Sequence, residues 1–180
     1  GTSEIKSGAW SHTNIIQEGS QLNNHIAFEW DTMDAWYEED EEVFVHARDP
    51  YKRIDSLPSS RHIKIVVGGV VVAESRSSVL LFETGLPTRY YIPKLDVDTK
   101  LLVPSTLTTQ CPYKGEARYY SVSIGETMIP DIAWYYPYPL IEVVKITGML
   151  CFFNERVDSI FVDSHEIARP KTPWSIPDEG

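Results

Sequence analysis

Two short turn segments carry side chains whose types suit proton transfer and anion binding. Glu83 ends an apolar stretch, and Arg89 follows it across the turn Gly85-Leu86-Pro87. A carboxylate at the edge of an apolar core can have a raised pKa, which suits a general acid or base. The simpler interpretation is an ion pair between Glu83 and Arg89. Both interpretations can hold, because a paired carboxylate can still line a pocket.

The second segment, Cys111-Pro112-Tyr113-Lys114-Gly115, is predicted to be a tight turn. A lysine held by a turn can bind an anion or form an imine, and otherwise Lys114 is a solvated surface residue. Its cation would favour a thiolate at Cys111, whereas the alternative for Cys111 is a small buried apolar residue. No histidine lies near Cys111 in the sequence to act as its base. The catalytic candidates are Glu83, Lys114 and Cys111.

Tyrosine and tryptophan gather in the segments around these turns. This aromatic density is either the ordinary packing of a β core or the wall of a cavity for a planar or apolar ligand. In the pair Tyr90-Tyr91 one ring must face the core and the other must not, because neighbours on a strand alternate. The candidate substrate-binding residues are Arg89, Tyr90, Tyr113, Tyr120, Trp134 and Tyr136.

We expect five of these residues, from separate segments, to surround one cavity: Glu83, Arg89, Cys111, Lys114 and Trp134. A charge placed there is costly without a partner, so Glu83 is expected to contact Arg89 or Lys114. Five histidines and two cysteines show no spacing typical of metal ligands, so we expect neither a metal site nor a cofactor.

Charge and hydropathy exclude two classes of partner. The chain carries 16 basic and 26 acidic residues, a formal net charge of -10, and nucleic-acid binders need a basic face. No apolar run approaches the roughly 18 residues of a membrane span, and no secretory signal is visible. We therefore expect no nucleic acid and no membrane as partners, and a cytoplasmic location.

The centre of the chain has the pattern of an all-β fold. From about 61 to 163, short segments of period-two alternation are separated by turn signals, and Gly68-Gly69 predicts a hairpin. Helical spacing predicts one short helix near 140–147. We predict a mainly antiparallel sandwich or open barrel with that one helix.

The flanking segments differ from this domain. We predict a flexible N-terminal arm over 1–24, a partial closing hairpin and acidic linker over 25–60, the β domain over 61–163, and an extended tail over 164–180. Residues 25–34 can be laid on 149–158 with a similar apolar pattern, and 43–46 are predicted to form a short strand. The aromatic residues of 25–46 present too much apolar area to leave in water, so this segment is expected to pack on the core or to form a homodimer.

Four segments carry a family resemblance: 81–91, 109–115, 119–122 and 133–137. Through them the region from about 61 to 163 resembles the DUF427 family, a domain of unknown function also filed as nucleotidyltransferase-like. Residues 34–41 look like the linker of tandem members, so the domain is similar to their second copy. The resemblance implies a small, mostly β fold akin to the β-tent or Mss4-like group, without an established activity. Many relatives have histidine where this chain has Gln110. Nucleotidyl transfer needs paired carboxylates beside a Gly-Ser element, but Gly19-Ser20 lies in the polar arm and Asp96 and Asp98 lie in a loop, so neither is on a strand edge in the expected order.

Three functions are compatible with these residues. The first is a metal-independent enzyme, a lyase, isomerase or hydrolase, acting on a small, partly apolar anionic molecule. Glu83 would be its acid or base, and Arg89 and Lys114 would hold the anion. The second is a non-catalytic module that binds a small molecule in the same pocket. The third is an interaction domain whose aromatic groove receives a peptide or protein.

Overall fold

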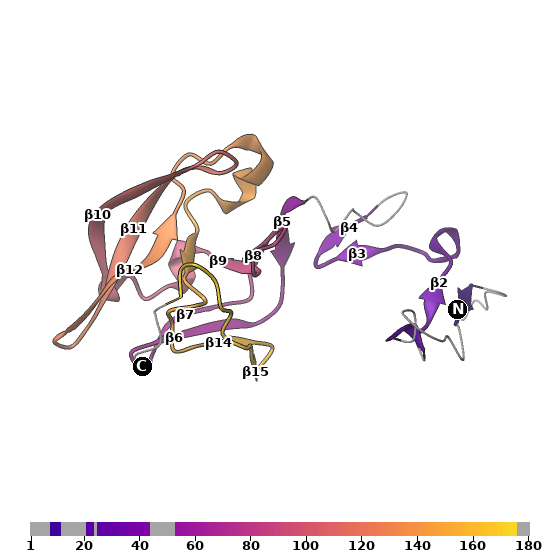
Figure 1. Cartoon of the computed structure of the whole chain (residues 1–180), viewed down its shortest axis with the longest axis horizontal. Coiled ribbons are helices and arrows are strands. Elements are labelled where there is room, and N and C mark those ends of the chain that lie inside the picture. Colours follow the sequence, from indigo (N-terminus) through magenta and orange to yellow (C-terminus); the bar gives the residue numbers. More distant parts are fainter. Residues whose placement is uncertain (1–7, 12–20, 24, 44–52, 176–180) are drawn as a thin grey trace. The chain divides into compact units, whose positions relative to one another are not determined.

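The computed structural model of the 180-residue chain describes residues 8–11, 21–23, 25–43 and 53–175 (Figure 1). The chain forms two compact units, residues 1–48 and 49–180. The strand predicted over 43–46 falls almost entirely outside the described residues.

The described residues of the first unit form four two-residue strands and short 3-10 turns. Strand β1 (Ala9–Trp10) pairs with β2 (Ala27–Phe28), β3 (Tyr37–Glu38) pairs with β4 (Glu41–Glu42), and η2 spans Trp30–Thr32. The acidic run is therefore part of a small hairpin. The strand expected from residue 25 is short, because the 3-10 turn begins at Trp30.

The aromatic side chains of this unit pack on one another. The rings of Trp30 and Trp36 stack with centroids 4.8 Å apart, and Phe28 meets Trp36 edge-on at 6.3 Å. The indole N–H of Trp36 donates to the Trp30 carbonyl at 2.9 Å. Part of the apolar area of residues 25–46 is thus buried locally. Pairing with a second chain through this segment stays a prediction.

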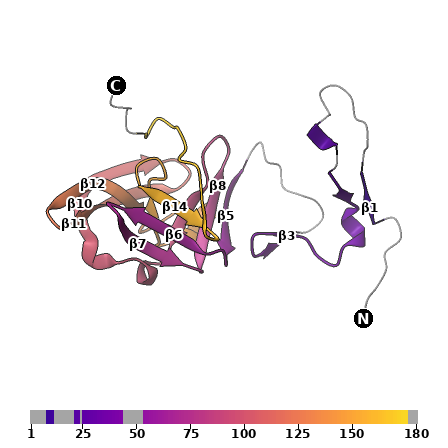
Figure 2. The same ribbon diagram turned by 90° about the horizontal axis from the view of Figure 1, so that it is seen from below.

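The second unit is built from two antiparallel sheets (Figure 2). The larger sheet has the order β10-β11-β12-β13-β9-β8-β5, and the smaller has the order β15-β14-β6-β7. The strands of the larger sheet are β5 (Ile54–Ser59), β8 (Ser78–Glu83), β9 (Arg89–Ile92), β10 (Leu102–Cys111), β11 (Gly115–Ile124), β12 (Thr127–Tyr135) and β13 (Leu150–Phe152). Those of the smaller are β6 (Ile63–Val67), β7 (Val70–Ser75), β14 (Ser159–Val162) and β15 (His165–Glu166).

Alternating burial explains the hairpin of β6 and β7. Ile63, Ile65 and Val67 are buried while the residues between them are partly exposed, so one face of β6 joins the core. The turn uses Gly68 at φ 55° and Gly69 at φ 75°, the primed conformation that matches the twist of the two strands. Buried side chains of both sheets form one hydrophobic cluster. From the larger sheet it includes residues of β8, β9 and β12.

The predicted all-β, mainly antiparallel fold is confirmed, with three differences of detail. First, β5 pairs along its whole length with β8, so the sheet begins before residue 61. The serines and the proline of β5 interrupt the apolar alternation by which a strand is predicted from sequence. Second, the expected helix is the 3-10 element η5 (Ile141–Ile146), interrupted at Val143 by a non-helical φ of -126°. Third, β10 is one strand of ten residues with a bulge between Pro104 and Thr108, although Pro104 stands within it.

Two further 3-10 turns, η3 (Lys94–Asp96) and η4 (Thr99–Leu101), connect β9 to β10. After β15 the tail runs on to a turn at 172–175, where Ser175 N–H donates to the Thr172 carbonyl at 3.0 Å. No helix in the described part of the chain has the length and apolar character needed to cross a bilayer.

Candidate functional site

One row of paired residues crosses five strands of the larger sheet. Tyr91 on β9 lies opposite Val79 on β8 and opposite Cys151 on β13, Cys151 lies opposite Trp134 on β12, and Trp134 lies opposite Tyr119 on β11. Directly paired residues point to the same face of a sheet. This face, which we call the site face, therefore carries the Tyr91, Trp134 and Tyr119 rings side by side.

Glu83 and Arg89 belong to the same face, because they lie at even spacing from Val79 and Tyr91 on β8 and β9. They do not pair with each other. Glu83 accepts a hydrogen bond from Lys114 Nζ at 2.6 Å, and the two side chains are 13% and 11% exposed. The predicted contact of Glu83 is thus made to Lys114 and joins β8 to the β10–β11 turn, 31 residues further along the chain.

The backbone holds Lys114 in place on two sides. Its N–H donates to the Cys111 carbonyl at 3.3 Å within the turn, and its carbonyl accepts from Leu140 N–H at 3.2 Å. Gly115 has a φ of 96°, and a Cβ there would lie 3.2 Å from the Tyr138 carbonyl oxygen. The loop that leads into η5 therefore packs directly on this turn. These contacts hold the backbone that carries the Lys114 side chain in place.

Tyr136 and Cys111 complete the surroundings of this pair. Tyr136 is buried, and burial raises its phenol pKa above the ordinary value, with further increases from negative charge on Cys111, Tyr119 and Glu83. Burial likewise raises the pKa of Tyr91, whose hydroxyl accepts a hydrogen bond from Trp134 Nε1 at 3.1 Å. Both phenols are therefore neutral near pH 7.

Arg89 lies on the same face but pairs with a different carboxylate, that of Glu155. Its guanidinium donates two parallel hydrogen bonds of 2.7 Å to Glu155, and the side chains are 6% and 0% exposed. Thr172 donates a third bond of 2.7 Å to Glu155, and Trp134 and Trp174 each lie 5.6 Å from the guanidinium. Burial alone would raise the pKa of Glu155, but the hydrogen bonds from Arg89 and Thr172 lower it below the ordinary value. Arg89 is thus neutralised by a carboxylate of the chain itself.

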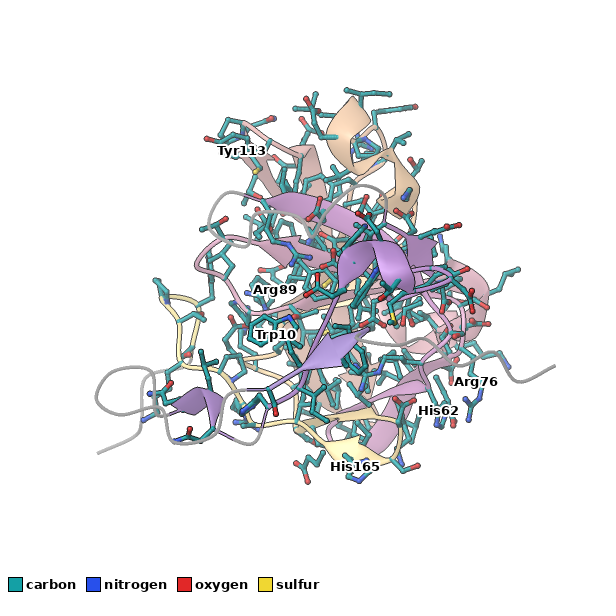
Figure 3. All side chains as sticks on the ribbon, turned by 90° about the vertical axis from the view of Figure 1, so that its right-hand side faces the viewer. Trp10, His62, Arg76, Arg89, Tyr113 and His165 are labelled. Atoms are coloured by element: carbon teal, nitrogen blue, oxygen red, sulfur yellow. The ribbon has the colours of Figure 1, made fainter. Side chains whose placement is uncertain are left out.

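Three of the expected pocket residues lie away from the site face. Tyr90 pairs with Leu80, and Tyr120 pairs with Ala133, which places both rings on the opposite face of the sheet. The Tyr120 ring stacks there on Tyr135 at 5.4 Å. Tyr113 sits at the tip of its turn and is 65% exposed, whereas Arg89 is buried. Figure 3 labels both residues. The site face therefore does not include these three tyrosines, which were expected to bind the substrate.

Residues 55–163 match the family model NTP_transf_9, described as a domain of unknown function (DUF427). The chain belongs to the DUF427 family. The match includes most of β5, in agreement with the place of that strand in the sheet. No curated protein shows significant similarity to the chain.

Sequence reasoning missed Glu155 and Tyr91 in this DUF427 domain. Glu155 lies in a turn 66 residues from Arg89, and no local pattern links the two. Tyr91 is fully buried in the middle of the site face, and the alternation of β9 pointed to one inward tyrosine without telling which. The register of β9 with β13 was the missing information.

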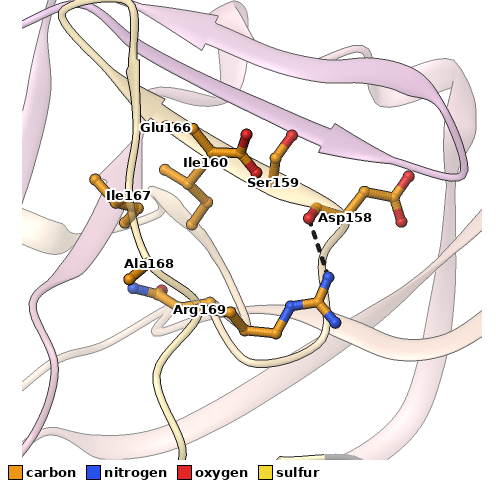
Figure 4. A pocket seen from close by; sticks show the side chains of 8 residues that line it. Asp158, Ser159, Ile160, Glu166, Ile167, Ala168 and Arg169 are labelled. Carbon is orange, nitrogen blue, oxygen red and sulfur yellow. Dashed lines mark hydrogen bonds between the residues drawn. The ribbon is translucent and has the colours of Figure 1, made fainter.

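A shallow pocket of about 160 Å³ lies apart from the Glu83–Lys114 pair. It sits between β14 and the start of the tail, where Arg169 donates to the Asp158 carbonyl at 3.0 Å (Figure 4). It contains none of the residues predicted for the site. Its lining residues are Asn154, Asp158, Ser159, Ile160, Glu166, Ile167, Ala168 and Arg169. Among the described residues, no group of three His, Cys, Asp or Glu side chains is arranged to hold a metal ion.

Proposed function

We propose that this DUF427 domain acts on a small, partly apolar anion at the Glu83–Lys114 pair, by proton transfer and without a metal ion. The observation that carries the proposal is the single short bond between Lys114 Nζ and Glu83 Oε1, made by side chains that keep slight exposure to water. Opposite charges at a partly buried site are available for exchange with a charged ligand.

Lys114 supplies the positive charge that holds the anion. A carboxylate or similar oxyanion accepts a hydrogen bond from Lys114 Nζ in place of Glu83 Oε1. The ammonium group replaces a metal ion as the source of positive charge. Arg89 is not needed for this step, because Glu155 already pairs with it.

Glu83 then becomes the proton acceptor. Once the ligand has taken its hydrogen bond, the carboxylate loses a stabilising cation contact and its proton affinity rises. It removes a proton from a carbon or oxygen next to the bound anion and later returns it, as in lyase, isomerase or hydrolase chemistry. The neutral Tyr136 and the edge of Trp134 provide the polar and apolar contacts of the reacting group.

A binding experiment with benzoate tests the anion site. Benzoate is expected to raise the melting temperature of the full chain, and Lys114→Met is expected to abolish the shift. Lys100→Met, which changes an exposed lysine on η4, is the matched control and keeps it. Benzylamine, with the same ring and the opposite charge, is expected to have no effect. Equal benzoate binding by wild type and Lys114→Met would contradict the proposal.

Phenylpyruvate tests the proton-transfer step, because its acidic C–H hydrogens can be followed in D₂O by proton NMR. The wild-type chain is expected to accelerate exchange of these hydrogens. Glu83→Gln should lose the acceleration and keep benzoate binding, whereas Glu126→Gln, at the exposed β11–β12 turn, should retain both. If Glu83→Gln binds benzoate and no variant differs in exchange, the domain is a binding module that uses the same residues.

A further inference from the structure

The outer edge of β10 differs from the other sheet edges of the second unit. The larger sheet ends in β10 on one side and β5 on the other, and the smaller sheet ends in β7 and β15. A sheet edge presents unpaired N–H and C=O groups that can pair with a further strand. Proteins that remain single usually cover such edges or place charge on them.

Three of the four edges are protected. β5 contains Pro58, which has no N–H, and η5 packs against this strand. β7 is bridged on its outer side, since Ala73 pairs with Val97 and Val72 accepts from Asp98 N–H at 2.9 Å. β15 has only two residues, which are too few to template a partner strand.

The β10 edge lacks these devices along its second half. The strand is ten residues long and contains no Asp, Glu, Lys or Arg, in a chain with 23% charged residues. Among the described residues no strand pairs with its outer side, and Figure 1 shows β10 at the margin of the domain. Pro104 and the following bulge interrupt the first half, where Leu107 N–H is bound by Ser105 Oγ at 3.0 Å. An exposed, regular stretch remains at 108–110.

The side chains beside this stretch are locally neutral. Glu116 on β11 accepts bonds from both Gln110 and Arg118, at 3.0 and 3.4 Å, so its charge is matched within the same chain. The whole chain carries a net charge of -10, which opposes association of two copies through most of its surface. β10 itself contributes no charge to that repulsion, and the same edge on a second copy has the same chemistry.

We propose that two copies of this chain associate through antiparallel pairing of their β10 strands, which joins the two larger sheets into one. A two-fold axis beside Thr109 places Thr109 of one copy opposite Thr109 of the other, and Thr108 opposite Gln110. Threonine pairs across antiparallel strands are favourable, and the C2 arrangement makes the edge its own complement. The short contact makes a weak dimer that forms with rising concentration.

Sedimentation of the full chain over a wide concentration range tests this pairing. We expect the mass to rise from 20.5 kDa toward twice that value. Thr108→Lys places two like charges beside the two-fold axis and should weaken association by about five- to tenfold. This change also lowers the net negative charge, so a weaker dimer must reflect the local contact. Thr127→Lys, the same substitution at an exposed position of β12, should leave association unchanged.

Hydrogen exchange gives a second measurement that does not depend on a variant. The outward amides of residues 108–110 should become protected as concentration rises, while those of the β5 edge should not change. A single 20.5 kDa species at every concentration overturns the proposal. A dimer that Thr108→Lys leaves intact, or one that only deletion of residues 1–52 removes, also overturns it, since association then uses another surface.

Discussion

Two ion pairs lie on the same face of the larger sheet, and they are built differently. Arg89 and Glu155 share two bonds of 2.7 Å, with almost no exposure and a third bond from Thr172. Lys114 and Glu83 share one bond of 2.6 Å and keep slight exposure. The first pair has its geometry and its lone pairs satisfied by the chain, whereas the second leaves donors and acceptors for other groups.

This difference separates stability from chemistry. A bidentate buried pair gains directional bonds but cannot exchange a partner without leaving a buried charge alone. A single lysine–carboxylate bond near water can be exchanged at a much lower free-energy cost. We therefore assign Arg89–Glu155 to the architecture of the domain, and Lys114–Glu83 to the candidate site.

The largest effect is expected from removing one partner of the buried pair. Arg89→Met should lower the free energy of unfolding by about 3–5 kcal/mol, because Glu155 is left buried without its cation. Urea unfolding followed by tryptophan fluorescence measures this loss. The double variant Arg89→Met with Glu155→Leu should recover most of it, since an apolar pair of similar volume removes the unpaired charge. If the double variant is as unstable as the single one, packing rather than charge explains the loss.

Raising the pH should lower the free energy of unfolding, because buried groups between the two ion pairs have raised pKa values. Burial raises the pKa of the Cys151 thiol to about 12, whereas an unfolded thiol ionises near pH 8.5. Between these values the unfolded chain releases a proton that the folded chain keeps, so stability falls as the pH rises, by about 1.4 kcal/mol per pH unit. Tyr91 and Tyr136, whose pKa values are also raised, add to the fall at still higher pH.

Unfolding measured at pH 8 and pH 10 checks this slope. Cys111→Ser removes the other thiol, so a slope that remains in this variant belongs to Cys151 and the tyrosines. Cys151→Ala should make the slope between these two pH values clearly shallower. A wild-type stability that is flat up to pH 10 would show that water reaches this part of the site face.

The fold was largely predictable because its strands follow simple rules. Alternation in β6, β11 and β12 and the Gly68-Gly69 turn are local signals, and they predicted the all-β architecture. Strand β5 was not predicted, because its own sequence is largely polar and its apolar environment is supplied by its partner β8. The helix near 140–147 appeared as a 3-10 turn, since its burial at Val143 and Ile146 depends on packing rather than on helix propensity.

The site was predictable only where turns fix both partners. Glu83 and Lys114 each lie at a strand end next to a glycine or proline turn, and a cost argument for buried charge correctly required a partner for Glu83. The partner of Arg89 was not predictable, because Glu155 reaches it through a non-local packing of the 153–157 turn. The faces of Tyr90 and Tyr120 depend on strand register, which a sequence alone does not define.

Breaking the partly buried Lys114–Glu83 pair should cost less than breaking the buried Arg89–Glu155 pair. Lys114→Met is expected to lower the free energy of unfolding by about 1 kcal/mol, because water can still solvate the Glu83 carboxylate. Urea unfolding of this variant beside Arg89→Met gives the comparison directly. A loss as large as that of Arg89→Met would mean that Glu83 is as dry as Glu155, and ligand exchange at this pair would then be ruled out.

The smallest effect concerns the tail that covers the buried pair. Thr172→Val removes the hydroxyl that donates to Glu155 Oε1 and accepts from Trp174 N–H at 3.2 Å, and it keeps the shape of the side chain. The loss should be about 0.5–1 kcal/mol, because Glu155 keeps its bonds from Arg89 and water can replace the hydroxyl at the exposed Trp174. Because the hydroxyl helps to lower the pKa of Glu155, the variant should lose its remaining stability at a higher pH on acidification. Glu155 stabilises the fold above the ordinary pKa of a glutamate, and this stabilisation is lost as the pH falls through the lowered pKa of the folded state. A pKa that is lowered less therefore moves the loss of stability to a higher pH.

Thr99→Val, on η4 outside the site face, is the matched control and should change neither quantity. If Thr172→Val leaves the acid unfolding midpoint unchanged, Arg89 alone determines the charge state of Glu155 and the tail only covers the pair.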